Sequence, residues 1–161
     1  FGLQKDDGHS LVHYKTFTSR LRNQLNMFVS RGGRVMVSGA YVGSDMLRDD
    51  ERRFLSDVIK VSYERSDRTQ TNNMVNGLGI NFDIIRNLNS VHDAATSVDV
   101  MHPSVSSAFC AMQYADGSSA AVAYDGGDYK SFVMGFPFEC INNMKARRQV
   151  MKAVMDFLVK R

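Results

Sequence analysis

The segment Leu25–Met46, LNMFVSRGGRVMVSGAYVGSDM, holds the clearest indication of how this chain folds. It ends an amphipathic helix, passes through Gly32-Gly33 and continues at once into the apolar run Arg34–Ser38. Glycine after a helix supplies the left-handed conformation that terminates it, and a strand apolar on both faces is typical of the centre of a parallel sheet. We therefore predict an α/β fold with Arg34–Ser38 as a central strand.

On either side of this strand the sequence predicts helices. The preceding one is expected over Tyr14–Arg31, because apolar residues recur on one helical face. These residues are Phe17, Leu21, Leu25, Phe28 and Val29. A second helix is expected at about Asp50–Lys60, after a loop punctuated by glycines. Residues 64–77 are polar and rich in turn formers, which predicts a surface loop, and residues 86–107 are predicted to be irregular.

The second half of the chain shows the two-residue period of β-strands. Alternation around Phe82 predicts a half-buried strand. Three more strands are expected at Ala108–Tyr114, Ala120–Tyr124 and Tyr129–Phe136, the first two joined by a hairpin turn. A closing amphipathic helix is predicted over Asn143–Val159. No repeat or linker interrupts the pattern, so we expect a single domain over residues 1–161, with an antiparallel meander extending its sheet.

Composition excludes several classes of function. The chain has 161 residues, of which 43% are hydrophobic, and a net charge of +3. No apolar run approaches the roughly 20 residues of a membrane helix, and no basic stripe with stacking aromatics indicates nucleic-acid binding. The sequence begins at Phe1 without the pattern of a signal peptide. We expect a C-terminal fragment of a longer protein, with any secretion signal upstream.

Neither a metal nor a cofactor is expected. The four histidines show no metal-ligand spacing; they are His9, His13, His92 and His102. The turn Asp125–Asp128 offers few oxygens for calcium and is explained by a hairpin. Cys110 and Cys140 lie in apolar stretches, which favours buried thiols, and their separation in sequence predicts no particular disulfide.

Two segments of the chain resemble the class I glutamine amidotransferase-like group. They are Leu25–Met46 and Phe132–Glu139, the second followed by the closing helix. More narrowly, the chain is similar to the C-terminal region of large secreted Bacteroides-type proteins described as xanthan lyases, a similarity that Leu3–Gly8 shares. The resemblance implies a three-layer, flavodoxin-like α/β fold and a secreted, periplasmic or cell-surface location. It also implies polysaccharide, or other domains of the same protein, as partners.

The catalytic motifs of that group are altered in this chain. The family's Gly-x-Cys-x-Gly nucleophile elbow corresponds to Gly39–Gly43, with Tyr41 where the cysteine belongs. A phenol with an ordinary pKa near 10 is a poor nucleophile at neutral pH. The family's His-Pro-Glu motif corresponds to Phe136–Glu139, with Phe136 in place of the histidine and one residue inserted before Glu139. Thiol-based hydrolysis of glutamine therefore has no mechanism here.

Three functions remain open from the sequence. The first is a non-catalytic accessory or scaffolding domain with a degenerate amidotransferase-like site, in which polar residues form turns and caps and Tyr41 fills the old pocket. The second is a carbohydrate-active lyase or hydrolase, since tyrosine, histidine and carboxylates suit proton abstraction. Its candidate catalytic residues are Tyr41, His9, Asp45 and Glu139, with Asp6, Asp7, Ser10 and Ser44 as binding residues. The third is a self-association module burying apolar surface around Phe136 and Phe138.

Overall fold

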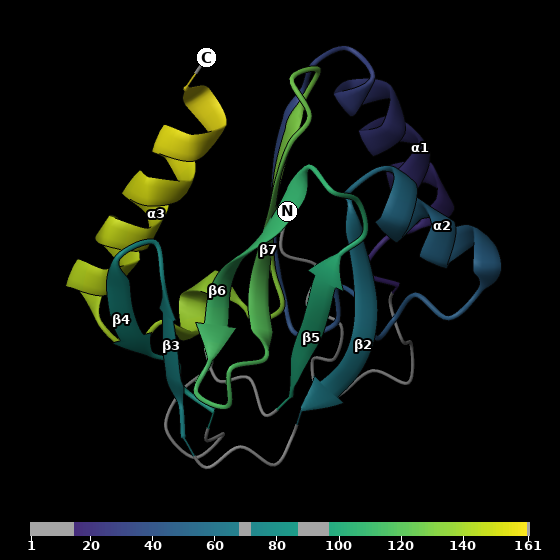
Figure 1. Cartoon of the computed structure of the whole chain (residues 1–161). Coiled ribbons are helices and arrows are strands. Elements are labelled where there is room, and N and C mark those ends of the chain that lie inside the picture. Colours follow the sequence, from purple (N-terminus) through teal and green to yellow (C-terminus); the bar gives the residue numbers. More distant parts are fainter. Residues whose placement is uncertain (1–14, 68–71, 87–96, 161) are drawn as a thin grey trace.

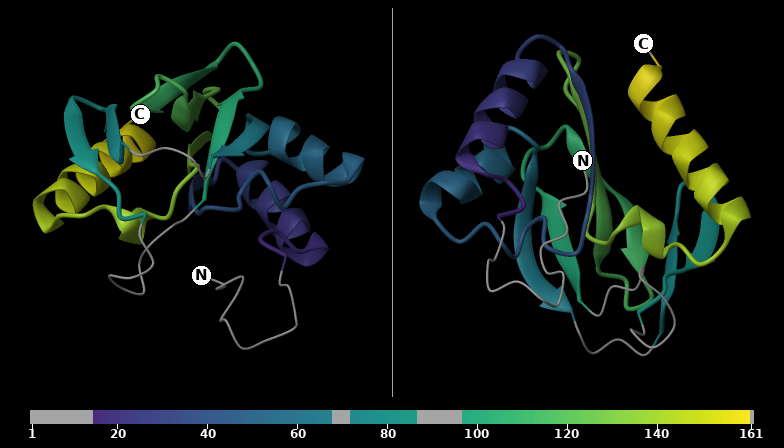
Figure 2. Two further views of the ribbon diagram at one scale, coloured as in Figure 1. Left: turned by 90° about the horizontal axis from the view of Figure 1, so that it is seen from below. Right: turned by 180° about the vertical axis from the view of Figure 1, so that it is seen from behind.

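A computed structural model describes residues 15–67, 72–86 and 97–160 of the chain. These residues form a curled mixed sheet with helices on both sides, as Figures 1 and 2 show. The helices are α1 (Ser19–Val29), α2 (Asp49–Asp57) and α3 (Met144–Val159), with a short 3-10 turn, η1 (Phe138–Cys140). The strands are β1 (Arg34–Ser38), β2 (Val61–Asp67), β3 (Met74–Gly77), β4 (Ile80–Asp83), β5 (Val98–Pro103), β6 (Ala108–Tyr114), β7 (Ser119–Asp125) and β8 (Lys130–Met134). No helix in these ranges is both long and apolar enough to cross a bilayer.

Six of the strands make one sheet, in the order β1-β8-β7-β6-β3-β4, and β2 pairs with β5 in a second sheet. Strands β1 and β8 run parallel, whereas the other pairs are antiparallel. The predicted α/β class is confirmed, and so is the antiparallel meander of β6, β7 and β8. Because the described residues contain one parallel pair, the flavodoxin-like layout stays a prediction.

The prediction that Arg34–Ser38 is a central strand is wrong. Strand β1 stands at the end of the strand order, with β8 as its hydrogen-bonded neighbour in the described part of the chain. Its apolar character has another cause. Val35 and Val37 pack into one hydrophobic core, while Met36 between them packs against a second. An edge strand covered on both faces therefore has the same sequence pattern as a central one.

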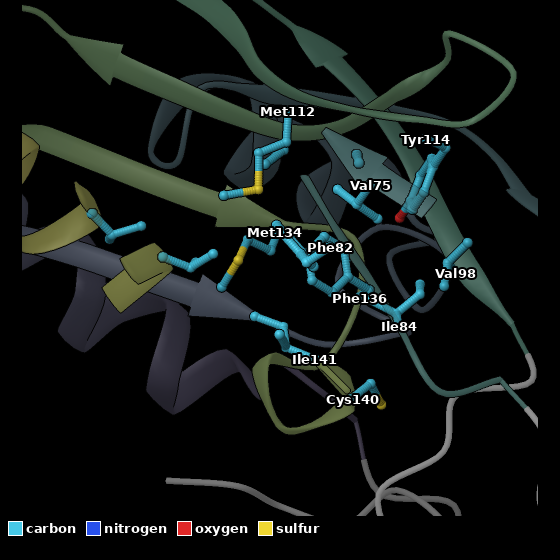
Figure 3. Close-up of a cluster of buried hydrophobic side chains, with 14 of the residues drawn as sticks. Val75, Phe82, Ile84, Val98, Met112, Tyr114, Met134, Phe136, Cys140 and Ile141 are labelled. Atoms are coloured by element: carbon cyan, nitrogen blue, oxygen red, sulfur yellow. The ribbon is translucent and has the colours of Figure 1, made fainter. Parts of the chain in front are cut away.

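The two cores occupy opposite faces of the large sheet. Figure 1 shows α3 on the left and α1 with α2 on the right. On the α3 side, Phe132 and Met134 of β8 pack with Val150 of the helix. Figure 3 shows part of this cluster, including Met134. On the other side, Val133 packs with Phe54 of α2. Because successive side chains of β8 point to opposite faces of the sheet, the strand packs against helices on both faces.

The helix ends follow local sequence rules. Gly32 adopts a φ of +79° and donates its N–H to the carbonyl of Val29, which confirms the predicted glycine stop of α1. Helix α1 begins later than predicted, at Ser19, because Thr18 caps it by accepting from the amide of Leu21 (3.3 Å). Phe28, predicted to be buried, is 51% exposed, since the adjacent Val29 takes the core-facing place.

Three strands lie where the sequence predicted loop or irregular structure. Strands β2 and β3 occupy parts of the predicted surface loop, and β5 falls in the predicted irregular region. Most residues of β2 are exposed or half-buried, so it lacks a clear two-residue period. Strand β5 has four consecutive buried residues with a carboxylate, Asp99, among them, and therefore shows no alternation either. The other predicted strands and the closing helix are confirmed within a few residues.

Gly135 joins the two sheets immediately after β8. The Asp99 amide of β5 donates to the Gly135 carbonyl (2.7 Å), and the Gly135 amide donates to the Ala120 carbonyl (2.9 Å). A Cβ atom at position 135 would lie 1.9 Å from the Asp99 carbonyl oxygen. Only glycine therefore permits β5 to approach the end of β8 this closely.

We expect Gly135→Ala to lower the free energy of unfolding by about 3 kcal/mol, because β5 must shift and its hydrogen bond to residue 135 must break. Urea-induced unfolding followed by circular dichroism measures the loss. Gly39→Ala is the matched control: its Cβ would meet Val42 Cγ2 at 3.3 Å, a small adjustment, and we expect a change within about 1 kcal/mol. Equal losses in both variants would contradict the assigned role of the close approach.

Candidate functional site

The carboxyl ends of β1 and β8 bring two separate segments together. Because these strands are parallel, with Ser38 opposite Met134, the turns that follow them leave the sheet at the same edge. The amide of Phe138 donates to the Ser38 hydroxyl (3.4 Å). The two segments singled out by the sequence, residues 39–43 and 136–139, are therefore neighbours. Clefts of open α/β sheets form at such edges, which makes this one the candidate site.

The segment after β1 is a compact turn over residues 40–45, closed where the Met46 amide donates to the Gly43 carbonyl (3.0 Å). Helix α2 starts only at Asp49, beyond the turn. A nucleophile elbow places its reactive residue directly before a helix, whose N-terminus stabilises a developing anion. Tyr41 lies in the turn itself, half-buried and packed against the α3-side core.

Asp99 of β5 inserts its carboxylate into this turn. Its Oδ2 accepts hydrogen bonds from the amide of Gly43 (2.8 Å), the amide of Ser44 (3.0 Å) and the Ser44 hydroxyl (3.3 Å). Its Oδ1 accepts from the hydroxyl of Ser66 (3.0 Å), which in turn shares a hydrogen bond with the Tyr63 hydroxyl (3.0 Å). Asp99 is fully buried, and this burial raises the pKa of its carboxyl despite the hydrogen bonds from Ser44, Gly43 and Ser66, which lower it.

The sequence prediction missed Asp99 because its segment was expected to be irregular. One signal was available: a lone carboxylate within the apolar run Val98–Met101. A charged residue among four consecutive core positions requires a hydrogen-bonded partner inside the protein.

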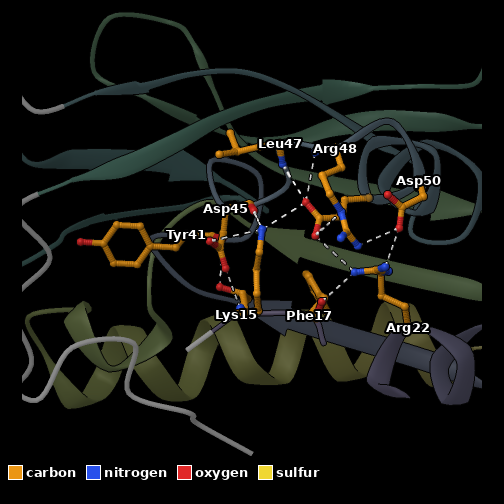
Figure 4. Close-up of polar contacts among 10 residues, drawn as sticks. Lys15, Phe17, Arg22, Tyr41, Asp45, Leu47, Arg48 and Asp50 are labelled. Atoms are coloured by element: carbon orange, nitrogen blue, oxygen red, sulfur yellow. Dashed lines mark hydrogen bonds and ion pairs between the residues drawn. The ribbon is translucent and has the colours of Figure 1, made fainter. Parts of the chain in front are cut away.

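Asp45 has a structural role at the other side of the turn. Its Oδ2 accepts from the amide of Thr16 (2.7 Å), and its carbonyl accepts from the Lys15 ammonium (2.6 Å). The Thr16 hydroxyl donates to the Tyr41 carbonyl (3.2 Å). Together these bonds hold the segment before α1 across the turn, while the Tyr41 ring points away from them (Figure 4).

Glu51, in the first turn of α2, anchors the same region. Its Oε2 accepts from the amides of Leu47 (3.0 Å) and Arg48 (3.1 Å) and from the Lys15 ammonium (3.1 Å). Its Oε1 lies 3.6 Å from Arg22 Nη1. Although Glu51 is only 1% exposed and burial alone would raise its pKa, the hydrogen bonds from Arg48, Lys15 and Leu47 outweigh burial and lower that pKa. Glu51 is thus an ionised structural carboxylate.

The predicted site residues are therefore distributed as follows. Ser44 binds Asp99, Asp45 binds Thr16, and neither role was predicted. Glu139 is exposed in η1, next to the end of β1. The remaining candidates fall outside the described residues; these are Asp6, Asp7, His9 and Ser10.

Two other predictions about single residues need correction. Phe136 is completely buried, with its ring 6.1 Å from that of Phe82, and Phe138 is half-buried against the same core. These rings therefore do not form the exposed apolar surface that the self-association hypothesis places there. Cys110, predicted to be buried, is exposed on β6, beside an irregularity in the pairing with β7 between Cys110 and Met112, whereas Cys140 is buried as predicted.

Across residues 15–67, 72–86 and 97–160, no three or more His, Cys, Asp or Glu side chains gather in an arrangement that would hold a metal ion. The backbone amides of Gly43 and Ser44 and the side chains of Ser44 and Asp45 are instead bonded within the protein.

Comparison with protein-family models and with curated proteins found no match. Solved structures do resemble this fold. A catalytic mutant of Gan42B, a GH42 β-galactosidase from G. stearothermophilus, superposes with a TM-score of 0.61 at 14% identity over 88% of this chain. The β-galactosidase of the Antarctic haloarchaeon Halorubrum lacusprofundi gives 0.60 at 15% identity over 88%. The exo-β-1,4-mannosidase Op5Man5 from Opitutaceae bacterium strain TAV5 gives 0.53 at 10% identity over 84%.

At these identities the likeness concerns the fold. This chain spans 20% of each of the two β-galactosidases and 22% of the mannosidase, about a fifth of their length. The same α/β arrangement therefore occurs as one part of much longer glycoside hydrolase chains.

We expect Glu51→Gln to lower the free energy of unfolding by about 1–3 kcal/mol at pH 7, because Lys15 and Arg22 lose their shared carboxylate. Because folding lowers the pKa of Glu51, its contribution is complete above the usual value of 4.5 and disappears as the pH falls through the folded pKa. Urea unfolding at several pH values should therefore show a shallower loss of stability below pH 4.5 in the variant than in wild type.

Asp49→Asn is the matched control, since Asp49 is an exposed carboxylate in the same helical turn. It should change the unfolding free energy at pH 7 by less than about 0.5 kcal/mol. If the unfolding free energies of wild type and Glu51→Gln fell equally steeply below pH 4.5, the assignment of Glu51 as an ionised anchor would be contradicted.

Proposed function

We propose that this chain is a non-catalytic accessory domain of a larger carbohydrate-processing protein. One observation supports this proposal above the others: the Gly43 and Ser44 amides and the Asp45 carboxylate, in the turn after β1, are occupied within the fold. The Gly43 and Ser44 amides bind Asp99, and Asp45 binds Thr16. A catalytic site requires groups that can turn to a substrate, and these groups are held by buried or half-buried internal contacts.

The structural neighbours supply the carbohydrate part of the proposal. They are glycoside hydrolases, and the region similar to this chain is about a fifth of each. A domain of this size within a long glycosidase suits a supporting role beside a separate catalytic part. A secreted or surface location for the parent protein belongs to the same proposal.

The amidotransferase-like origin of the site is also proposed. Helices on both faces of a curled sheet are compatible with the three-layer, flavodoxin-like layout expected from the sequence. The turn after β1 lies where an elbow would lie, with Tyr41 in place of a cysteine, and Phe136 replaces a histidine and is buried. On this interpretation the fold has kept the position of the old site and lost its chemistry.

A second candidate is a carbohydrate-active lyase or hydrolase using Tyr41, with Glu139 and His9 as further groups. It is favoured by the position of Tyr41 and the exposed Glu139 on segments that meet at one sheet edge. The glycoside hydrolase neighbours add weight to it. Against it stands the structural use of Ser44 and Asp45.

Two activity assays test the main proposal. Purified protein should release no ammonia from glutamine, because neither a thiol nor a histidine occupies the motif positions. Incubated with a panel of acidic polysaccharides, it should form neither unsaturated uronates nor new reducing ends. Glutaminase activity, or turnover of any polysaccharide, would contradict a non-catalytic role.

Tyr41→Phe separates the two candidates. For an accessory domain, the variant should bind every polysaccharide as wild type does and lose at most about 0.5–1.5 kcal/mol of stability. Tyr129→Phe is the matched control, since its hydroxyl donates to the Val58 carbonyl (2.8 Å) in the opposite core. Turnover or binding by wild type that is abolished in Tyr41→Phe and retained in Tyr129→Phe would establish the second candidate instead.

A further inference from the structure

The turn after β1 presents successive backbone amides to a single oxygen atom. The N–H groups of Gly43 and Ser44 both point to Oδ2 of Asp99, at 2.8 and 3.0 Å, and the Ser44 hydroxyl adds a third donor at 3.3 Å. Consecutive amides that converge in this way form an anion-binding concavity, often called a nest. The anion comes from a strand 56 residues further along the chain, so it is not part of the local turn.

The second oxygen of the same carboxylate is also recognised. The Ser66 hydroxyl donates to Oδ1 (3.0 Å) and is itself held by the Tyr63 hydroxyl (3.0 Å). The concavity thus binds both oxygens of a planar carboxylate, from two sides, through donors that are all uncharged. This geometry distinguishes a carboxylate from a halide, which offers a single acceptor atom.

The site is also tightly enclosed. Asp99 is completely buried, and a Cβ atom at Gly43 would lie 2.6 Å from Cδ2 of Tyr63, so the turn has no room for a side chain there. If the Asp99 carboxylate were removed, the two amides would face a small polar cavity without an acceptor. An unsatisfied buried donor is costly, which favours entry of an anion of matching shape.

We propose that the Gly43–Ser44 turn is a carboxylate-binding site that the chain fills with its own Asp99 side chain. In the wild-type protein Asp99 closes the site to external carboxylates. Shortening that side chain to alanine opens the site to a monocarboxylate of the size of formate. This inference concerns the ligand chemistry of the turn, and it stands whether or not the parent protein processes carbohydrate.

Thermal unfolding of Asp99→Ala in sodium formate tests the proposal, with sodium chloride at the same ionic strength as the reference. In chloride the Tm of the variant should fall by about 3–10 °C relative to wild type. Formate should raise it in a saturable manner, by about 3–5 °C at ten times its dissociation constant. In Asp99→Asn the amide oxygen still fills the turn, so this variant and wild type should show no formate-specific change.

Amide chemical shifts locate the binding. A formate titration of ¹⁵N-labelled Asp99→Ala should shift the Gly43 and Ser44 resonances, with little change at Gly117, in a turn distant in sequence. Should Asp99→Ala not remain folded, dilution from urea into formate or chloride replaces thermal unfolding. A higher yield of folded protein in formate then supports the proposal, and equal yields overturn it.

Three other results would overturn the proposal. One is an equal response to formate and chloride in Asp99→Ala, which would indicate ionic strength alone. Another is a formate response of the same size in wild type or Asp99→Asn, which would place the binding elsewhere. The third is formate-dependent stabilisation of Asp99→Ala without shifts at Gly43 and Ser44. The polysaccharide and glutaminase assays do not bear on any of these outcomes.

Discussion

The contacts of Asp99 connect four parts of the fold. Its amide donates to Gly135 after β8 and its carbonyl accepts from the Tyr114 hydroxyl of β6 (3.1 Å). Its carboxylate binds the turn after β1 and the Ser66 hydroxyl of β2. The small β2-β5 sheet is therefore fixed to the large sheet by main chain and side chain together. Gly135 makes this possible, because any Cβ there would strike the Asp99 carbonyl.

A buried carboxylate is tolerated at this point because hydrogen bonds replace the water it has lost. The donors are uncharged amides and hydroxyls, so burial still dominates and the pKa of Asp99 is raised. Glu51 shows the opposite balance, since an ammonium group joins two amides around it and its pKa is lowered. The pKa values of these two buried acids, both close to the same turn, are therefore shifted in opposite directions, because only Glu51 has a charged donor among its partners. Both serve the packing of the turn.

Ser44 and Asp45 illustrate how far residue type can mislead about function. As neighbours in a glycine-rich turn after a buried strand, they have the residue types and position of catalytic or sugar-binding groups. In the fold Ser44 turns toward β5, and Asp45 turns toward the segment before α1. The glycines around them serve close packing: Gly43 lies against the ring of Tyr63. The sequence placed these residues at the carboxyl ends of the strands and left open whether they form turns and caps or bind a substrate.

The sequence by itself determined the features that depend on neighbours along the chain. The glycine stop of α1 follows from the φ of Gly32, the β6–β7 hairpin from Gly117, and the closing helix from the period of its apolar residues and the Asn143 cap. Tertiary structure alone decided that β1 stands at an edge, that β2 and β5 are strands, and that Asp99 fills the turn after β1. Each of these depends on a partner far away in the sequence, and such a partner leaves no local pattern. A strand covered on both faces looks the same at an edge as at the centre, and a buried carboxylate is interpretable only when its distant donors are known.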